Sequence, residues 1–259
     1  MDPALFDNDL DEPGIISPER LHRDRRVPDT AVLCFFNDLL ADLVLEGALR
    51  QIYTLRSEIG RNPVYEYSTA DGPLTVVHPG VGAPLAAGVL EELRGLGVRT
   101  IVACGGAGAL RAELDLGHVV VVDSAVRDEG TSFHYAPPGR VIDADERARQ
   151  MVEDVLRERG VDFITGRTWT TDGFFRETRR RVERRISEGC SVVDMESAAL
   201  IAVAKYYDLT FAQLLYAGDL LSGEEWDSRH WDQALHHRRA LFDMAIRAAS
   251  RLRTLSAPH

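Results

Sequence analysis

The chain alternates short apolar runs with longer segments in which apolar residues recur at helical spacing. Within each run the apolar residues are consecutive, a pattern that predicts strands covered on both faces of a sheet. The runs are Ala31–Phe36, Leu74–His78, Thr100–Cys104, His118–Asp123, Phe163–Trp169, Ser191–Val193 and Phe211–Tyr216.

The segments between these runs predict amphipathic or buried helices. They are Asn37–Gln51, Pro84–Leu96, Ala144–Arg159, Glu177–Glu188, Glu196–Tyr207 and Trp231–Leu255. Strands that alternate with helices predict an α/β fold with a mostly parallel central sheet. No internal repeat and no linker divides the chain. We therefore expect residues 1–29 to form an extended N-terminal arm and residues 30–259 to form a single domain.

The chain of 259 residues carries a formal net charge of -11. Such a charge repels a phosphate backbone, which argues against a nucleic-acid partner. The Arg-rich run at 176–185 is a local exception, and its interspersed glutamates predict a solvated helix face. No apolar stretch reaches the roughly 20 residues that cross a membrane, and the acidic N-terminus lacks the pattern of a signal peptide. We expect a cytoplasmic protein without a membrane partner, whose three cysteines are buried and reduced.

Two glycine-rich segments follow predicted strands, at the sheet edge where open α/β folds bind ligands. His78–Pro84 reads HPGVGAP and precedes a helix, so the amide of Gly82 either binds an anion or belongs to a plain tight turn. Cys104–Ala109 reads CGGAGA. There Gly105 and Gly106 leave room either for a ligand against bare backbone or for close packing within the sheet.

Acidic residues stand at the ends of two further predicted strands. In Asp194-Met195-Glu196-Ser197 a buried carboxylate is costly unless it binds something, although Asp194 also fits the role of a helix cap. Glu196 is therefore a candidate to accept hydrogen bonds from sugar hydroxyls. Asp219 can protonate or hydrogen-bond a leaving group, or it can be a helix N-cap or a turn residue. The adjacent His236 and His237 lack partner ligands, and the sequence indicates neither a metal site nor a serine hydrolase motif.

Four stretches of the chain together resemble one known family. They are His78–Pro84, Leu93–Leu110 (LRGLGVRTIVACGGAGAL), Gly117–Pro138 (GHVVVVDSAVRDEGTSFHYAPP) and Val193–Ala198 (VDMESA). In order and spacing they resemble the nucleoside phosphorylase superfamily, and most closely its uridine phosphorylase branch. The resemblance covers about residues 30–255.

The resemblance implies a three-layer α/β/α fold with a mixed, barrel-like central sheet. It implies a pentosyltransferase of nucleoside salvage that cleaves uridine or a purine nucleoside with phosphate, giving free base and ribose 1-phosphate. Phosphate is then a co-substrate, and no metal or organic cofactor is needed. The family also implies a homo-oligomer, a dimer or hexamer, in which a neighbouring subunit completes the site.

Roles for individual residues follow from the same resemblance. Glu196 and Asp219 would be catalytic, and Glu196 would favour the positive charge that develops on the ribose. Met195 would lie against the ribose, and Phe174 and Arg176 would lie at the base. Gly82, Gly105, Gly106 and Arg61 would bind phosphate, with Arg61 contributed by a neighbouring subunit. Arg127 and His134 would serve site architecture and subunit contact.

The chain departs from the family pattern where phosphate should bind. The family's Gly-Asp-Pro-x-Arg is replaced by the segment 34–38, which reads CFFND. Ala103 stands in place of a second arginine and Gly106 in place of a threonine. A phosphate dianion favours several charged donors. Two alternatives to a phosphorylase therefore stay open: a nucleosidase that uses water, and a nucleoside-binding protein without catalysis.

Overall fold

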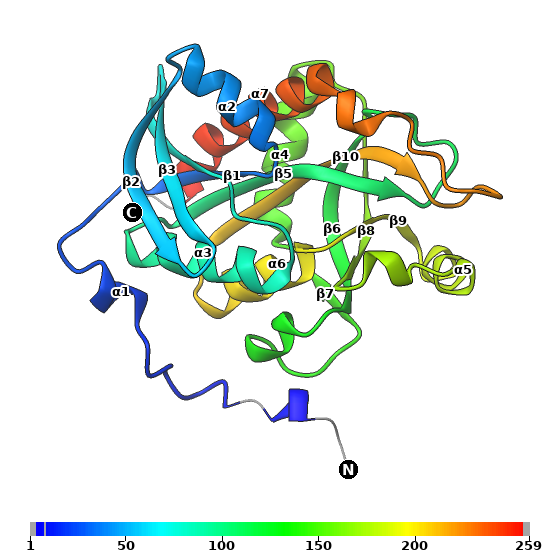
Figure 1. The fold of residues 1–259 in the computed structure, drawn as a ribbon, viewed down its shortest axis with the longest axis horizontal. Helices are drawn as coiled ribbons and strands as arrows, with labels where there is room; N and C mark the ends of the chain where they lie inside the picture. Colours follow the sequence, from blue (N-terminus) through cyan, green and yellow to red (C-terminus); the bar gives the residue numbers. More distant parts are fainter. Residues whose placement is uncertain (1–3, 8, 256–259) are drawn as a thin grey trace.

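A mixed sheet runs through the molecule and closes on itself at one end (Figure 1). The structure, a computed structural model, describes residues 4–7 and 9–255. The strand order is β10-β6-β8-β9-β5-β1-β4-β3-β2, with β7 paired to β6. Because β10 also pairs with β5, the strands β10, β6, β8, β9 and β5 form a closed, barrel-like ring.

The strands of this sheet are β1 (Thr30–Cys34), β2 (Leu49–Ser57), β3 (Gly60–Thr69), β4 (Gly72–Val77), β5 (Thr100–Ala109), β6 (Val119–Asp128), β7 (Val141–Asp143), β8 (Phe163–Thr171), β9 (Cys190–Asp194) and β10 (Thr210–Leu220). The helices are α1 (Pro18–Leu21), α2 (Asn37–Leu45), α3 (Ala83–Gly95), α4 (Glu146–Glu158), α5 (Arg179–Ser187), α6 (Ser197–Tyr206) and α7 (Leu235–Leu252).

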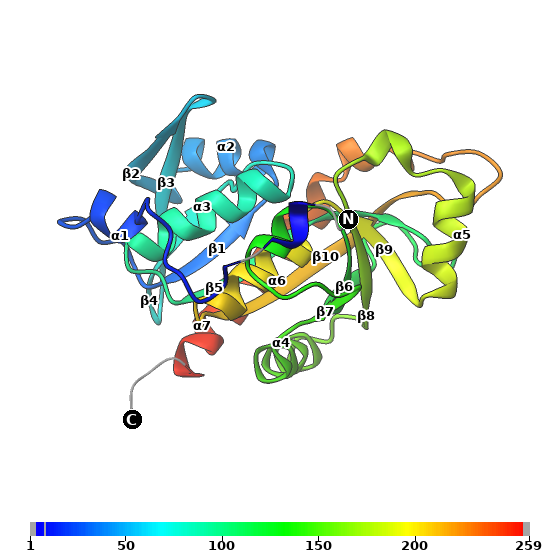
Figure 2. The same cartoon turned by 90° about the horizontal axis from the view of Figure 1, so that it is seen from below.

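Helices cover the sheet on both faces. The apolar sides of α3 and α6 join one buried cluster with the strands, and those of α2, α4 and α7 join a second cluster on the other face. Figure 2 shows α3 and α6 together on the face seen from below. The three-layer α/β/α arrangement with a mixed, barrel-like sheet is therefore confirmed.

The expectation of a mostly parallel sheet is wrong. Antiparallel pairing joins β2 to β3, β3 to β4, β5 to β9, β6 to β7 and β6 to β10. The hairpin of β2 and β3 was not predicted, because most of its residues are exposed or half-buried and do not form apolar runs.

The helix expected over 37–51 ends at Leu45. Gly47 follows with a positive φ of 73°, and its N–H donates to the Val44 carbonyl, which is a common way for a helix to stop. At the other end of the chain, the helix expected from Trp231 begins only at Leu235. A separate turn of 3-10 helix (η4) covers Trp231–Gln233.

Two glycine-containing stretches expected to follow strands lie inside them. β5 continues through Gly105 and Gly106 to Ala109, and β10 continues through Asp219 to Leu220. The two strands pair in parallel from Thr210 opposite Thr100, with a register shift after Ala217. The glycine-containing ends of β5 and β10 stay extended because each strand supplies backbone hydrogen-bond partners to the other.

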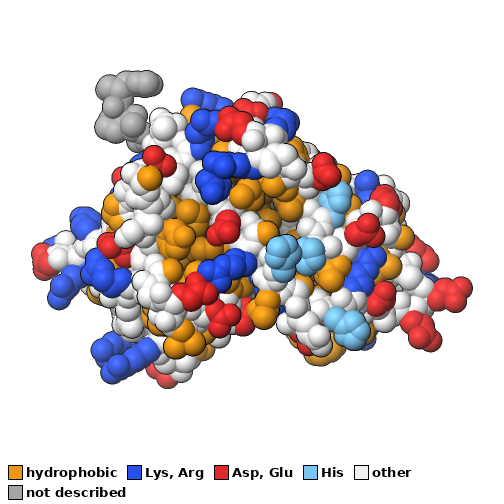
Figure 3. Space-filling model, turned by 90° about the horizontal axis from the view of Figure 1, so that it is seen from above, with side chains coloured by type: hydrophobic (Ala, Val, Ile, Leu, Met, Phe, Trp, Pro, Cys, Tyr) orange, Lys and Arg blue, Asp and Glu red, His pale blue; other side chains and the backbone are white. Residues whose placement is uncertain are grey.

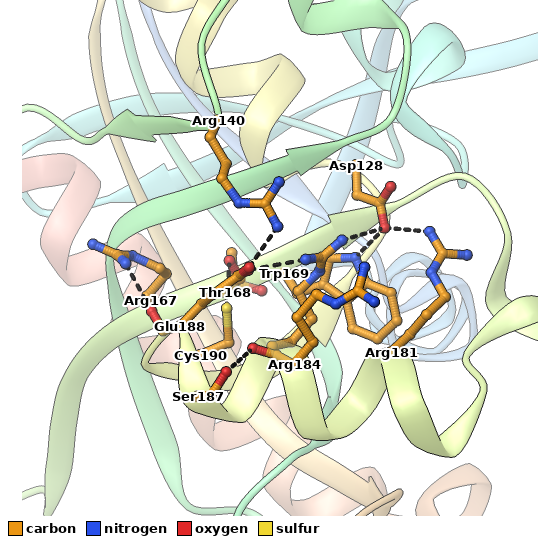
Figure 4. Close-up of polar contacts among 11 residues, drawn as sticks. Asp128, Arg140, Arg167, Thr168, Trp169, Arg181, Arg184, Ser187, Glu188 and Cys190 are labelled. Carbon is orange, nitrogen blue, oxygen red and sulfur yellow. Dashed lines mark hydrogen bonds and ion pairs between the residues drawn. The ribbon is translucent and has the colours of Figure 1, made fainter.

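The arginine-rich helix α5 is anchored by Asp128 at the end of β6 and by Glu188 at its own C-terminal end (Figure 4). Asp128 accepts hydrogen bonds from the Trp169 indole at 2.8 Å, from Arg181 and from Arg185. Glu188 pairs with Arg185 and with Arg140. Much of this run is exposed, as expected for a solvated face, but Arg185 is buried because its charge is paired.

The N-terminal segment lies along the outside of α3. In α1, Glu19 forms an ion pair with Arg94, and His22 Nε2 lies 2.6 Å from the Glu92 carboxylate. Cys34, Cys104 and Cys190 are buried and unbridged, as expected. Among the described residues, no helix is long and apolar enough to span a membrane.

Candidate functional site

The candidate site forms where the β4–α3 turn meets the β9–α6 turn. Gly82 lies 114 residues from Glu196 along the chain, yet its N–H donates to Glu196 Oε1 at 2.6 Å. Gly82 is also the N-cap position of α3. A carboxylate at a helix N-terminus is favoured by the free N–H groups and by the helix dipole. Glu196 is thus held at the end of α3.

The carboxylate of Glu196 is buried, with a relative exposure of 7%. Burial, and then the nearby charge of Asp194, raise the pKa of Glu196 to about 8, although hydrogen bonds from Gly82 and Met195 oppose the shift. Among residues 4–7 and 9–255, no arginine or lysine forms a hydrogen bond or ion pair with it. A buried acid without a counterion is costly, so this position is chemically unusual.

Asp194 holds the turn that presents Glu196. Its Oδ2 accepts the backbone N–H groups of Glu196 at 3.0 Å and Ser197 at 2.6 Å, and also the Ser197 hydroxyl. Its Oδ1 accepts the hydroxyls of Thr168 and Thr170 at 3.0 and 2.9 Å. All of its contacts are internal, so Asp194 is a capping residue, the alternative considered for it from the sequence.

The His78–Pro84 turn is closed by its own side chain. His78 Nδ1 accepts the Gly80 N–H at 3.0 Å, and the ring forms a second hydrogen bond with the backbone of Phe35. Burial lowers the pKa of His78, which keeps the imidazole neutral. Gly80 and Gly82 have positive φ values of 82° and 96°, which explains why glycine stands at both positions.

The glycines of β5 pack against aromatic rings. A Cβ atom placed on Gly105 would lie 3.2 Å from Cδ2 of Phe35, and one on Gly106 would lie 3.3 Å from the ring of Tyr216. Of the two possibilities left open by the sequence, close packing describes Gly105. Gly106 is exposed at the same strand end.

Asp219 lies beside Gly108, near the end of β10. A Cβ atom on Gly108 would lie 3.4 Å from Asp219 Oδ1, and the Trp226 indole N–H donates to Asp219 Oδ2 at 2.6 Å. Glu177 faces this acid, and burial together with the charge of Asp219 raises the pKa of Glu177 to about 7. Arg179 donates to the carbonyls of Gly223 and Glu224, which ties the segment of Glu177 to the segment after β10.

Sequence reasoning missed Glu177 and Trp226. For Glu177 a signal was present, because it stands directly after Arg176 where the uridine phosphorylase branch was expected to read the base. For Trp226 no local pattern pointed to Asp219. Contacts between separate loops of this kind arise only from the tertiary fold.

Other expected site residues lie on the rim or outside it. Phe174 is 51% exposed, and its ring centroid is 4.1 Å from that of Phe175. Arg176 is exposed beside Gly173. Arg61 is exposed near the tip of the β2–β3 hairpin, paired in register with Arg56. Figure 3 shows hydrophobic side chains gathered on the face seen from above, between charged groups of both signs.

Arg127 organises the loop that follows β6. Its guanidinium donates to the Ser132 hydroxyl at 2.8 Å and to the carbonyls of Ala136 and Pro137, and it stacks 4.0 Å from the centroid of Phe133. His134 is exposed in the same loop. These contacts hold the loop together, and the expected roles of Arg127 and His134 in site architecture and subunit contact stay predictions.

Sequence comparison identifies relatives over most of the chain. A sequence model described as the Phosphorylase superfamily matches residues 29–251. Guanosine phosphorylase of Halorubrum lacusprofundi is 28% identical over 214 residues, which cover 81% of this chain and 85% of the relative. Uridine phosphorylase of Escherichia coli is 27% identical over 168 residues, which cover 60% of this chain and 62% of the relative.

Solved structures share the fold at lower identity. Purine nucleoside phosphorylase from Toxoplasma gondii matches with a TM-score of 0.77 and 20% identity, over 94% of this chain and 99% of that chain. AMP nucleosidase from Bacteroides thetaiotaomicron matches with a TM-score of 0.71 and 20% identity, over 92% of each chain. Because the sequence match spans most of the chain and the fold agrees, this protein belongs to the nucleoside phosphorylase superfamily.

Proposed function

We propose that this chain cleaves the N-glycosidic bond of a nucleoside, with Glu196 as the catalytic carboxylate. The observation that carries the proposal is the buried Glu196 side chain, which lacks a cationic partner among the described residues and is held by the backbone amides of Gly82 and Met195. An acid in such a place destabilises the fold unless a ligand or reaction uses its charge.

The chemistry of glycosidic cleavage suits this carboxylate. Positive charge develops on the ribose as the bond to the base breaks. An ionised Glu196 would accept hydrogen bonds from the sugar hydroxyls and stabilise that charge in a site of low dielectric constant. The neighbouring Met195, half-buried on the same turn, would pack against the sugar.

The acids at Asp219 and Glu177 suit the departing base. The base nitrogen gains electrons as the bond breaks, so a proton donor near it lowers the barrier. A pair of carboxyl groups with one pKa raised to about 7 retains a proton near neutral pH. We assign Asp219 to the base and Glu177 to holding that proton beside it, with Phe174 stacked on the base and Arg176 at its edge.

The relatives support this class of reaction without fixing the base. Their names include phosphorylases for guanosine and for uridine, and one solved neighbour is an AMP nucleosidase. We therefore propose a small-molecule nucleoside as substrate and a place in nucleoside salvage. We also propose a homo-oligomer in which Arg61 reaches a neighbouring subunit, because its own contacts leave it at an exposed hairpin.

A panel of nucleosides tests the proposal. Purified protein is incubated with ribo- and deoxyribonucleosides of each base, in buffers with and without phosphate, and free base is separated by chromatography. The expected result is release of at least one base. No release under any condition, with ligand affinity unchanged in Glu196→Ala, would instead support the nucleoside-binding alternative.

A further inference from the structure

We propose that the acceptor of the sugar in this chain is water, because the pocket expected to hold phosphate is filled by Phe35 and by Glu196. This inference rests on the proposed function, since it names the co-substrate of the same site. The pocket is defined by the segments expected to bind phosphate within one chain: the turn at Gly82, and Gly105 with Gly106 near the end of β5. Arg61, the fourth residue expected there, is exposed on the β2–β3 hairpin and forms no part of this pocket in its own chain.

The first observation is the ring of Phe35. Phe35 follows β1, and its N–H donates to the Cys104 carbonyl at 3.0 Å, which places the residue directly beside Gly105. A Cβ atom on Gly105 would lie 3.2 Å from Cδ2 of the ring and 3.5 Å from both Cβ and Cγ of Phe35. The ring also meets His78 edge-on, with centroids 6.3 Å apart. Phe35 therefore occupies the bare backbone surface that would otherwise face an anion.

The second observation concerns the amides of the glycine turn. The Gly80 N–H donates to His78, and the Gly82 N–H donates to Glu196. Pro84, at the start of α3, has no N–H to offer. An anion bound here would displace the Glu196 carboxyl group from the Gly82 amide. The helix N-terminus already has an acceptor, which is a side chain of the protein itself.

The third observation is the pairing of the nearby arginine. Arg238 approaches the ring of Phe36, with its guanidinium carbon 5.8 Å from the centroid. Its donors are taken by Asp38, by the Trp231 carbonyl and by the Tyr216 hydroxyl. Asp38 therefore neutralises the charge of Arg238. A phosphate dianion favours free charged donors, and Arg238 is not one.

Water, unlike phosphate, is uncharged and can act at this site without charged donors. In the proposed step, the water oxygen forms a bond to C1′ of the ribose as the C1′–N bond breaks, and that electron pair goes to the base nitrogen. The proton that water loses balances the proton gained by the base. The products are free base and free ribose, and no other reactant is required.

The experiment compares release of base by the full chain in phosphate-free buffer and in buffer containing inorganic phosphate at matched ionic strength. Formation of any sugar phosphate is followed by phosphorus NMR. We expect less than about a twofold change in initial rate and no sugar phosphate. Release that requires phosphate and yields an equal amount of sugar phosphate overturns the inference while sustaining the proposed function. Absence of release in both buffers overturns the proposed function itself.

A variant tests the role of Phe35 directly. Phe35→Ala opens the surface of Gly105, and Phe6→Ala, in the N-terminal arm, controls for the loss of a ring elsewhere. We expect inorganic phosphate to raise the melting temperature of Phe35→Ala, relative to chloride, by more than it raises that of wild type or Phe6→Ala, which share only the general stabilising effect of this salt. A rise in wild type as large as that of Phe35→Ala contradicts a closed pocket. Should Phe35→Ala fail to fold, the wild-type melt and the product assay still decide the question.

Discussion

The charge state of Glu196 should make the stability of the protein depend on pH in a way that its glutamine variant does not share. The ordinary pKa of a glutamate is 4.5, and burial with the charge of Asp194 raises that of Glu196 to about 8. Below about pH 4.5 the residue is protonated in both the folded and unfolded states, so it contributes no difference. Above that pH the unfolded chain loses the proton while the folded chain keeps it.

The sign and size of the effect follow from this difference. The folded state binds more protons between pH 4.5 and about 8, so the free energy of unfolding falls as pH rises through that window. For each pH unit over which the folded state holds one more proton, the free energy of unfolding changes by about 1.4 kcal/mol. Between about pH 5 and pH 8, Glu196 alone should therefore lower the free energy of unfolding by roughly 3–4 kcal/mol.

Urea unfolding measures the effect. Wild type and Glu196→Gln are unfolded at matched protein concentration across this pH range, and the difference in their free energies of unfolding is plotted against pH. The subtraction removes other titrating groups, including Glu177, whose pKa is raised in the same direction. We expect the variant to gain stability over wild type steadily as pH rises. If the difference between the two free energies of unfolding stays constant across this pH range, Glu196 is not a buried acid in the folded chain.

Further consequences can be measured separately. Asp194→Ala removes the acceptor of five hydrogen bonds and should cost about 3–5 kcal/mol in urea unfolding, whereas Asp219→Ala should stay within about 1 kcal/mol. The pH profile of kcat/KM should peak between 7 and 8, because Glu196 must lose a proton while the Glu177–Asp219 pair keeps one. In Glu177→Gln the fall above the peak should disappear, and an unchanged profile would remove Glu177 from the mechanism. Gly47→Ala should destabilise the protein by about 1 kcal/mol because of its positive φ, whereas Gly88→Ala, inside α3 with open space around it, should stabilise it by up to about 1 kcal/mol.

The core strands were predictable because they are buried on both faces. Runs such as Thr100–Cys104 and Phe211–Tyr216 are apolar at consecutive positions, and both begin strands of the closed ring. The hairpin of β2 and β3 was not predictable in this way. Most of its residues are exposed or half-buried, and the register of the two strands shifts between Gln51 and Tyr53. The predicted ends of two strands were also wrong, because β5 and β10 continue through glycines that local patterns assign to loops.

The candidate site was predictable in part for a similar reason. Two acids after a buried strand, at Asp194 and Glu196, are conspicuous in sequence because burying them is costly. The loss of the family's Gly-Asp-Pro-x-Arg, with Cys34 at the position of its glycine and Phe35 next to it, was also visible. Its consequence was not, because Phe35 meets Gly105 across 70 positions of the chain, and the sequence leaves open whether that glycine binds a ligand or packs. Only the tertiary fold decides between the two.

The central claim is that the Glu196 carboxylate drives cleavage of a nucleoside. The most direct test is the rate of free-base release by wild type and by Glu196→Gln, on the best substrate of the panel and above pH 8, with circular dichroism to establish that both are folded. We predict a loss of at least about a hundredfold in kcat/KM, which corresponds to roughly 3 kcal/mol of transition-state stabilisation. Equal rates for the two proteins would contradict the account.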